Sequence, residues 1–189
     1  MIKPKRVLIT GAHSPLGMAV LQKLQKCTDC HVVALVTPWC SNTPVIQSKD
    51  SITVLEQDLR LPLSEAVTRE VSRADILLHF AWFRDVDVHV ATTENKLIIR
   101  QLLEYLPSSS RFVFISSVGA SYQTRSAYGK AKWEVAQLIE GNGGLVLVCG
   151  LVISDPPFGP YAILTKWVQK LWIRPRFFAP NVPVYLTPL

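Results

Sequence analysis

The sequence lacks any apolar run long enough to cross a membrane and contains few cysteines. Only four of its 189 residues are cysteine. The longest apolar runs, such as GLVLVCGLVI at 144–153, are shorter than the roughly 20 residues that a membrane helix needs, and glycine interrupts them. The N-terminus passes from a basic start directly into a strand-like run, without the small-residue cleavage site of a secretory signal. We therefore expect no transmembrane segment and a cytoplasmic location.

The cysteines give weak support for metal or redox chemistry. Cys27 and Cys30 form a C-x-x-C pair, and His31 and Cys40 follow, so a zinc site built from these four residues is one alternative. Their spacing matches no standard zinc ribbon or zinc finger, which favours the absence of a metal. A redox pair is disfavoured because the two cysteines follow the end of a predicted helix, whereas reactive cysteines lie at a helix N-terminus. Cys149, inside an apolar run, is expected to be a small core residue.

Charge is also scarce, and its balance is positive. Charged residues make up 18% of the chain, and the formal net charge is +6. The basic residues are scattered except for one concentration near the C-terminus, at Lys166, Lys170, Arg174 and Arg176. No helix-turn-helix, zinc-finger or RNA-binding motif accompanies the charge. This pattern favours a small anionic ligand or a surface contact, and we expect no nucleic-acid partner.

Short apolar runs alternate with amphipathic segments, and 49% of the residues are hydrophobic. Strands are predicted at 5–10, 31–36, 52–55, 75–80, 111–116 and 145–150, and helices at 15–26, 63–73, 89–106 and 126–140. Near-continuous apolar strands joined by helices indicate a parallel sheet covered on both faces. The predicted fold class is therefore α/β, with a doubly wound parallel sheet.

Two polar, proline-containing stretches, 38–50 and 154–160, are predicted to be loops. From Tyr161 onward a helix is predicted that ends before Pro175, since a residue before proline rarely stays helical. Its apolar residues recur at helical spacing: Ile163, Leu164, Trp167, Val168, Leu171 and Trp172. Two interpretations stay open for this helix. It packs on the domain or a partner, or its Trp and Lys side chains lie on a membrane surface.

The loop TGAHSPLG, residues 10–17, follows the first predicted strand and opens the first predicted helix. In a phosphate-binding turn of this kind, Gly11 would permit the tight turn and Gly17 the close packing of helix on strand. Pro15 suits the first helical turn, so free amides of that turn, including that of Leu16, could face an anion. Ser14 stands where a middle glycine is usual, so its hydroxymethyl group would either crowd a phosphate or donate a hydrogen bond to it.

A tyrosine and a lysine share one face of a later helix. The segment SAYGKAKWEVAQLI places Tyr128 and Lys132 four residues apart. The preceding strand ends in FVFISSVGA, which puts Ser116 and Ser117 at the carboxyl edge of the sheet, where ligands bind in such folds. Ser117 precedes Tyr128 closely enough for both side chains to flank one cleft.

Several motifs follow one another along residues 5 to 155, and together they are more specific than any one of them. They are TGAHSPLG, EQDLR after the third predicted strand, LLHFAWF after the fourth, ENKLIIRQLLEYL, ISSVGASY and YGKAK. In this order they resemble the extended branch of the short-chain dehydrogenase/reductase superfamily, the NAD(P)-dependent epimerases and dehydratases. The resemblance implies a Rossmann-like fold and a nicotinamide dinucleotide as cofactor.

The resemblance also implies site residues. Cofactor contacts fall on Gly11, Ser14, Leu16, Gly17, Asp58, Ala81, Asn95 and Lys132, catalytic roles fall on Ser117, Tyr128 and Lys132, and no metal is implied. Asp58 would contact the adenine, or would merely cap the turn before Leu59. Asn95 would support the active site, or would be a solvated helix residue.

The implied chemistry follows from the side chains. A free tyrosine has a pKa near ~10 and is a poor base at neutral pH. The Lys132 ammonium and the positive ring of an oxidised cofactor would lower the pKa of Tyr128, which could then exchange a proton with a substrate oxygen during hydride transfer. Ser117 would hydrogen-bond the same oxygen, with Ser116 as its substitute, and Lys132 would also hold the cofactor ribose.

The choice between NAD and NADP rests on the segment ALVTPWC at the end of the second predicted strand. NAD sites usually place Asp or Glu there, and NADP sites tend to place Arg nearby. The segment contains neither. Without the carboxylate the main repulsion against a 2′-phosphate is missing, and the positive net charge acts in the same direction, so the balance favours NADP.

The resemblance weakens beyond residue 155. We predict a dinucleotide-binding domain at 1–155 and a truncated C-terminal substrate region at 156–189, where Val-Cys-Gly replaces the usual Arg-Pro-Gly before the proline-glycine turn. The implied function is an NAD(P)-dependent oxidoreductase, or an epimerase or dehydratase, acting on a hydroxyl or ketone of a nucleotide-sugar-like or other small polar substrate. A homodimer or a partner subunit would complete the pocket. The alternative is a non-catalytic NAD(P)-binding sensor or scaffold.

Overall fold

The structure is a computed structural model that describes residues 4–39, 51–171 and 186–188. The chain divides into two compact units, Met1–Leu147 and Val148–Leu189, and each is described by itself. The predicted functional boundary at residue 155 lies beyond this division.

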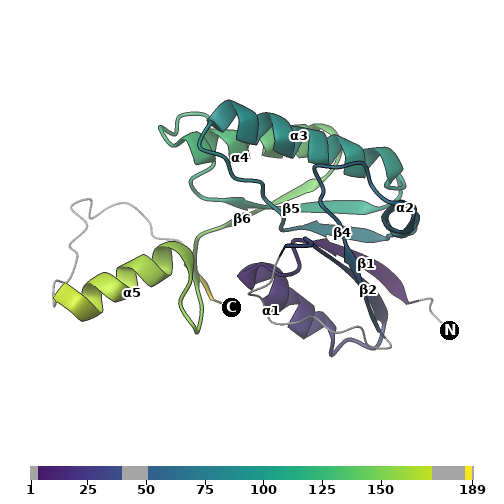
Figure 1. The fold of residues 1–189 in the computed structure, drawn as a ribbon, viewed down its shortest axis with the longest axis horizontal. Helices are drawn as coiled ribbons and strands as arrows, with labels where there is room; N and C mark the ends of the chain where they lie inside the picture. Colours follow the sequence, from purple (N-terminus) through teal and green to yellow (C-terminus); the bar gives the residue numbers. More distant parts are fainter. Residues whose placement is uncertain (1–3, 40–50, 172–185, 189) are drawn as a thin grey trace. The chain divides into compact units, whose positions relative to one another are not determined.

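The first unit is built on a six-stranded sheet with the order β3-β2-β1-β4-β5-β6 (Figure 1). The strands are β1 (Lys5–Thr10), β2 (Cys30–Val36), β3 (Ile52–Glu56), β4 (Ile76–His79), β5 (Arg111–Ser117) and β6 (Leu145–Cys149). β1 pairs in parallel with β2 on one side and with β4 on the other, and the pairs β2–β3 and β4–β5 are also parallel. The order of the strands reverses between β1 and β4, which is where ligands bind in open α/β sheets.

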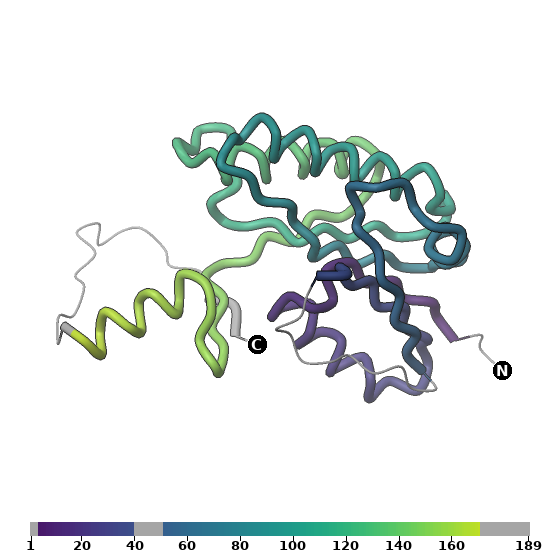
Figure 2. The backbone as a smooth tube through the Cα atoms, in the orientation of Figure 1, coloured from purple at the N-terminus to yellow at the C-terminus, as the bar shows by residue number. Residues whose placement is uncertain are grey.

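Alternate residues of the strands face two separate cores. Val7 and Ile9 pack with Leu21 of α1 (Pro15–Leu24), whereas Leu8 between them packs on the other face with α2 (Glu65–Val71), α3 (Val88–Tyr105) and α4 (Ala127–Gly141). In Figures 1 and 2, α3 and α4 cover one face of the sheet and α1 the other. The predicted doubly wound α/β fold is confirmed.

Side-chain caps explain where the helices begin. Ser14, Ser64 and Ser126 each accept a hydrogen bond from the backbone N–H three residues later, and Asp87 accepts one from the N–H of His89. Such caps satisfy donors that have no partner within the helix. The predicted helices and strands of the six-stranded sheet and its flanking layers lie within two residues of the observed bounds.

The second unit contains α5 (Gly159–Leu171) and a parallel pair of short strands, β7 (Leu151–Ile153) and β8 (Leu186–Pro188). The strand pair was not predicted, because three-residue strands far apart in sequence leave no local pattern. Residues 172–185, including the predicted helix end, lie outside the described part of the chain. On α5, the side chains of Ile163, Trp167 and Val168 are exposed. Across the described ranges, no helix combines the length and the apolar composition needed to span a bilayer.

Candidate functional site

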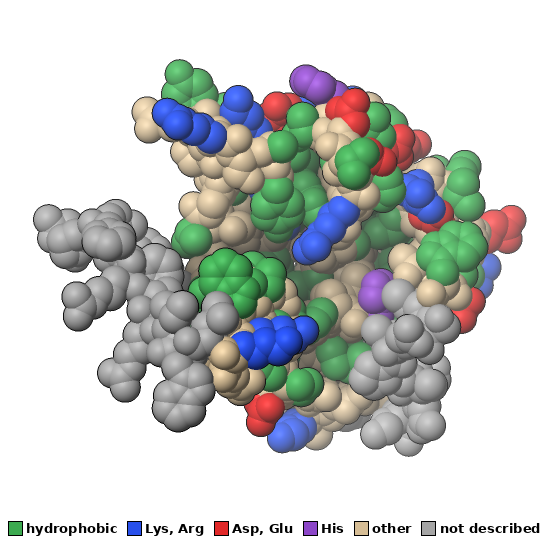
Figure 3. Space-filling view, turned by 60° about the vertical axis from the view of Figure 1, so that its left-hand side comes forward, with side chains coloured by type: hydrophobic (Ala, Val, Ile, Leu, Met, Phe, Trp, Pro, Cys, Tyr) green, Lys and Arg blue, Asp and Glu red, His purple; other side chains and the backbone are tan. Residues whose placement is uncertain are grey.

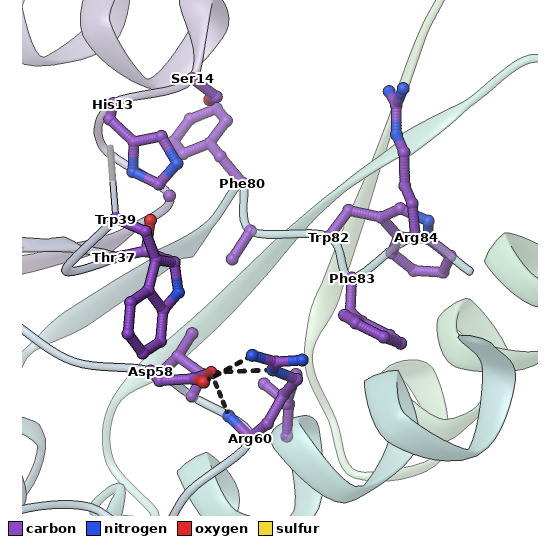
Figure 4. Close-up of a pocket in the computed structure, with 14 residues that line it drawn as sticks. His13, Ser14, Thr37, Trp39, Asp58, Arg60, Phe80, Trp82, Phe83 and Arg84 are labelled. Carbon is purple, nitrogen blue, oxygen red and sulfur yellow. Dashed lines mark hydrogen bonds and ion pairs between the residues drawn. The ribbon is translucent and has the colours of Figure 1, made fainter. Parts of the chain in front are cut away.

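A groove of about 420 Å³ opens at the carboxyl ends of β1, β2 and β4, at the point where the strand order reverses (Figure 4). It is lined by Gly11, His13, Ser14, Thr37, Trp39, Asp58, Leu59, Arg60, Phe80, Ala81, Trp82, Phe83, Arg84 and Ile98. Four residues expected to contact a cofactor, Gly11, Ser14, Asp58 and Ala81, therefore line one groove. The place of this groove in the fold is the usual place of a ligand in an open α/β sheet.

Two glycines of the first loop are required by the geometry of the turn. Gly11 has a φ of 64°, and a Cβ added to it would lie 2.6 Å from the backbone nitrogen of Ala81. At Gly17 a Cβ would collide with the carbonyl oxygen of Gly11 and lie 3.0 Å from the Oγ of Ser14. The first glycine thus lets the loop approach the chain after β4, and the last lets α1 pack against the turn.

Ser14 points back to its own helix. Its Oγ accepts a hydrogen bond of 3.1 Å from the N–H of Gly17, and its carbonyl accepts one of 2.7 Å from the N–H of Met18. Pro15 has no N–H, so the N–H of Leu16 is the donor of this turn that stays open in the described part of the chain. The hydroxyl is therefore used as a helix cap, and the helix N-terminus can receive an anion through a backbone donor.

Asp58, which follows β3 closely, forms an ion pair with Arg60 in the lining of the groove. Its carboxylate accepts hydrogen bonds from the Nη2 (2.7 Å), the Nε (3.0 Å) and the backbone N–H (3.1 Å) of Arg60. These bonds hold the pKa of Asp58 below its ordinary value. The guanidinium in turn lies 5.2 Å from the ring centroid of Phe83. Figure 4 shows this pair facing the Trp39 indole across the groove.

Asn95 fixes the loop that follows β4. Its Nδ2 donates to the carbonyls of Phe83 (2.8 Å) and Ala91 (2.7 Å), and its Oδ1 accepts from the N–H of Phe83 (3.1 Å). The side chain is 1% exposed. The alternative of a solvated helix residue is therefore wrong, and Asn95 supports the groove through the backbone of Phe83.

Lys132 is buried beside aromatic rings. Its Nζ donates a hydrogen bond of 2.7 Å to the carbonyl of Ile115 at the end of β5. The same atom lies 4.5 Å from the ring centroids of both Trp82 and Phe114 and 5.9 Å from that of Tyr128. The residue is 6% exposed. The predicted pairing of Tyr128 and Lys132 on one helix face is thus present, with aromatic rings around the ammonium.

The pKa of Tyr128 differs from the expectation. Burial of the phenol raises this pKa above its ordinary value, and the positive charge that opposes the shift belongs to Arg84. Lys132 was expected to lower this pKa; its ammonium lies 5.9 Å from the Tyr128 ring centroid and donates to the carbonyl of Ile115, and the net shift is nevertheless upward. In this structure, therefore, Tyr128 holds its proton at neutral pH.

The two serines after β5 have different surroundings. The Oγ of Ser117 accepts a hydrogen bond of 3.2 Å from the N–H of Gly119. Ser116 is 5% exposed, and its Oγ has no hydrogen-bond partner among the described residues. Ser117 therefore has the exposure that a contact with substrate needs, while Ser116 is enclosed.

The structure brings the predicted residues together in two neighbouring groups. Gly11, Ser14, Asp58 and Ala81 line the groove, whereas Leu16, Gly17, Asn95, Ser117, Tyr128 and Lys132 lie outside its lining. Trp82 connects the groups, because its indole lines the groove and meets the Tyr128 ring edge-on at 5.8 Å. Sequence reasoning missed Trp39, Arg60 and Arg84. Their position just after β2, β3 and β4 is the signal that could have found them.

A buried histidine lies under the groove. The Nδ1 of His79 and the Oγ1 of Thr10, the last residues of β4 and β1, share a hydrogen bond of 2.7 Å. Burial, and to a lesser extent the Lys132 charge, lowers the pKa of His79 to about 3. The imidazole is therefore neutral in the folded protein under ordinary conditions.

This histidine predicts a loss of stability in mild acid. Below pH 6.5 the unfolded chain binds a proton that folded His79 does not bind until the pH nears 3, so stability is complete above pH 6.5 and falls as the pH is lowered. The free energy of unfolding should decrease by up to about 1.4 kcal/mol per pH unit. Urea unfolding from pH 7 to roughly pH 5, where most carboxylates stay ionised, measures it. An unchanged midpoint over this range would contradict the assignment.

The cysteines give no support for a reactive thiol or a metal site among the described residues. Burial raises the pKa of the Cys30 thiol, which disfavours a reactive thiolate. Cys40 lies outside the described residues, and within the described ranges no group of three or more His, Cys, Asp or Glu could hold a metal.

On the face drawn in Figure 3, described Lys and Arg side chains stand among hydrophobic and neutral ones without forming a continuous stripe. Lys166 and Lys170 are exposed on α5, and Arg174 and Arg176 lie outside the described residues.

The strand order, the glycine turn and the groove at the reversal point define a Rossmann-like doubly wound fold. Solved structures share it. A UDP-glucose 4-epimerase of Thermotoga maritima, determined with UDP-glucose, has a TM-score of 0.64 and 19% identity. The Bordetella bronchiseptica enzyme WbmH, determined with NAD+, has a TM-score of 0.67 and 16% identity, and a UDP-glucuronic acid 4-epimerase of Bacillus cereus, determined with NAD, has 0.62 and 20%.

The likeness covers most of this chain but only part of each solved structure. These three structures match 87–88% of this chain, while this chain covers 62–63% of theirs. No family model and no curated protein sequence matches the chain. The chain thus has the fold of these three proteins and spans less than two thirds of their length.

Proposed function

We propose that this protein binds a nicotinamide dinucleotide and uses it in an oxidoreductase, epimerase or dehydratase reaction of the short-chain dehydrogenase/reductase type. The observation that carries the proposal is the groove at the reversal of the sheet, which is lined by Gly11 and Ser14 of the first turn and by Trp82, whose ring meets that of Tyr128. The fold shared with NAD-bound solved structures supports it.

The residues of the groove fit a dinucleotide. The N-terminus of α1, with the Leu16 N–H, offers a donor for the pyrophosphate. Asp58 and Trp39 supply a polar edge and an aromatic face for the adenosine end. No carboxylate follows β2 at residues 37–39, while the Arg60 guanidinium lies in the groove, which favours a 2′-phosphate and hence NADP.

The catalytic group is the phenol of Tyr128. When bound, the nicotinamide ring would supply or accept the hydride. Because its pKa is raised, Tyr128 holds a proton at neutral pH and can donate it to a carbonyl oxygen as that oxygen gains negative charge. For the reverse direction the phenol needs a nearby positive charge, which Lys132 and Arg84 are placed to provide. Ser117 would donate a hydrogen bond to the same oxygen.

The proposed substrate is a nucleotide-sugar-like or other small polar molecule with a hydroxyl or a ketone. The similar solved structures include one determined with UDP-glucose, which supports this class. The chain covers 62% of that structure. The proposed partner, besides the substrate, is a second copy of the chain or another subunit. A non-catalytic NAD(P) sensor or scaffold is the second candidate, because the same groove would bind the dinucleotide without turnover.

Cofactor binding is the first test. We expect NADPH at about 100 times its dissociation constant to raise the free energy of unfolding by about 2.7 kcal/mol, and NADH at the same concentration to raise it less. Thermal and urea unfolding with each dinucleotide measure this. Arg60→Gln should weaken NADPH binding more than NADH binding if the guanidinium contacts the 2′-phosphate. The absence of stabilisation by either dinucleotide would overturn the catalytic and the sensor proposals together.

A further inference from the structure

Trp82 is the residue through which the groove meets the catalytic pair. Its indole lines the groove, stands edge-on to the Tyr128 ring at a centroid distance of 5.8 Å and an angle of 78°, and lies 6.2 Å from the Phe114 ring. The Lys132 Nζ lies over its face at 4.5 Å. One side chain therefore contacts both members of the tyrosine and lysine pair.

Aromatic rings offset part of the free-energy cost of burying the Lys132 ammonium. A buried charge is costly unless polar groups or aromatic faces replace its water. Here the Nζ has the faces of Trp82 and Phe114, each 4.5 Å away, and the carbonyl of Ile115 at 2.7 Å. Phe114 and Ile115 belong to β5, whereas Trp82 belongs to the loop after β4.

The backbone around Trp82 is held on both sides. On one side, Ala81 approaches Gly11 so closely that a Cβ on the glycine would lie 2.6 Å from the Ala81 nitrogen. On the other, Asn95 bonds both the N–H and the carbonyl of Phe83. The indole is therefore attached to a fixed stretch of chain, which lets it set the place of a flexible lysine.

We propose that Trp82 is a positioning residue that holds the Lys132 ammonium beside Tyr128 at the end of the groove. The inference deepens the proposed function, on which its role in cofactor binding rests. Two further titratable groups face this site: His79, whose pKa is affected by the Lys132 charge, and Arg84, whose charge acts on Tyr128. Trp82 thus fixes the position of one of the two positive charges near the phenol.

A double-mutant cycle tests the inference through binding. Trp82→Leu should weaken NADPH binding about tenfold where Lys132 is present, and by less than about twofold where Lys132→Met has removed the ammonium. Trp82→Phe keeps a ring with a weaker negative face and should give an intermediate loss. An equal loss in both lysine backgrounds would show that the indole has only a structural role and would overturn the inference.

A titration of the phenol tests the same inference without any dinucleotide. The phenolate absorption that is lost in Tyr128→Phe reports Tyr128 alone. Lys132→Met should raise this pKa, and the rise should be smaller in the Trp82→Phe and Trp82→Leu backgrounds, where the ammonium is no longer held beside the ring. Equal rises in all backgrounds would overturn the inference.

The matched control is Trp133→Phe, which alters an indole on α4 that lies tilted against the Tyr122 ring at a centroid distance of 6.0 Å. This variant should leave the titration of Tyr128 and its response to Lys132→Met unchanged. If the wild-type protein binds neither NADH nor NADPH, the proposed function fails while the phenol titration still decides the role of Trp82. If the wild-type protein binds the dinucleotide but neither the binding cycle nor the phenol titration shows coupling between Trp82 and Lys132, the inference alone fails.

Discussion

Tyr128→Phe is expected to lower turnover about a thousandfold while leaving dinucleotide binding close to that of the wild-type protein. The substitution removes the hydroxyl that we propose exchanges the proton and keeps the ring that packs edge-on against Trp82. Binding is measured by titration with NADPH and NADH. Turnover is measured with UDP-glucose and UDP-glucuronic acid, the sugar nucleotides named with similar solved structures.

The control for this prediction is Tyr122→Phe, which removes a hydroxyl from a tyrosine that is 70% exposed and whose ring contacts Trp133. It should leave turnover unchanged. Equal turnover by Tyr128→Phe and the wild-type protein would remove Tyr128 from the mechanism. Binding without turnover of any sugar nucleotide by the wild-type protein would favour the non-catalytic sensor or scaffold instead.

Gly11→Ala is expected to lower the free energy of unfolding by about 3 kcal/mol and to abolish dinucleotide binding. An alanine at a φ of 64° costs about 1–2 kcal/mol. Its Cβ would also lie 2.6 Å from the nitrogen and 2.8 Å from the Cα of Ala81, and this backbone cannot yield as a flexible side chain would. The strain of that displacement adds roughly 1–3 kcal/mol. Urea unfolding and NADPH titration measure the two effects.

Gly143→Ala is the matched control for Gly11→Ala. Gly143 also has a positive φ, 76°, but a Cβ there would meet nothing within 4 Å. Its replacement should therefore cost only the conformational part, about 1–2 kcal/mol, and leave binding intact. If both alanine variants lost the same stability and bound NADPH equally well, the close approach of Gly11 to Ala81 would have no energetic importance.

Local pattern was sufficient for most of the fold. The strands were predictable because each is a short run rich in Val, Ile, Leu or Phe. In β1 this run is buried on both faces, as Val7, Leu8 and Ile9 show by alternating between two cores. Helix starts were marked by serines such as Ser64 and Ser126, whose capping role depends on the next three residues alone. The pair β7 and β8 escaped prediction, because its partners are short and distant in sequence.

The sequence by itself determined the doubly wound sheet, the glycine turn at Gly11 and the spacing that places Tyr128 and Lys132 on one helix face. These depend on residue type and local periodicity. Only the tertiary structure decided that Asn95 holds the loop after β4 and that the ammonium of Lys132 is directed to a carbonyl and to aromatic faces. These outcomes depend on side-chain direction and on contacts between distant strands, which determine burial and charge and which no local pattern encodes.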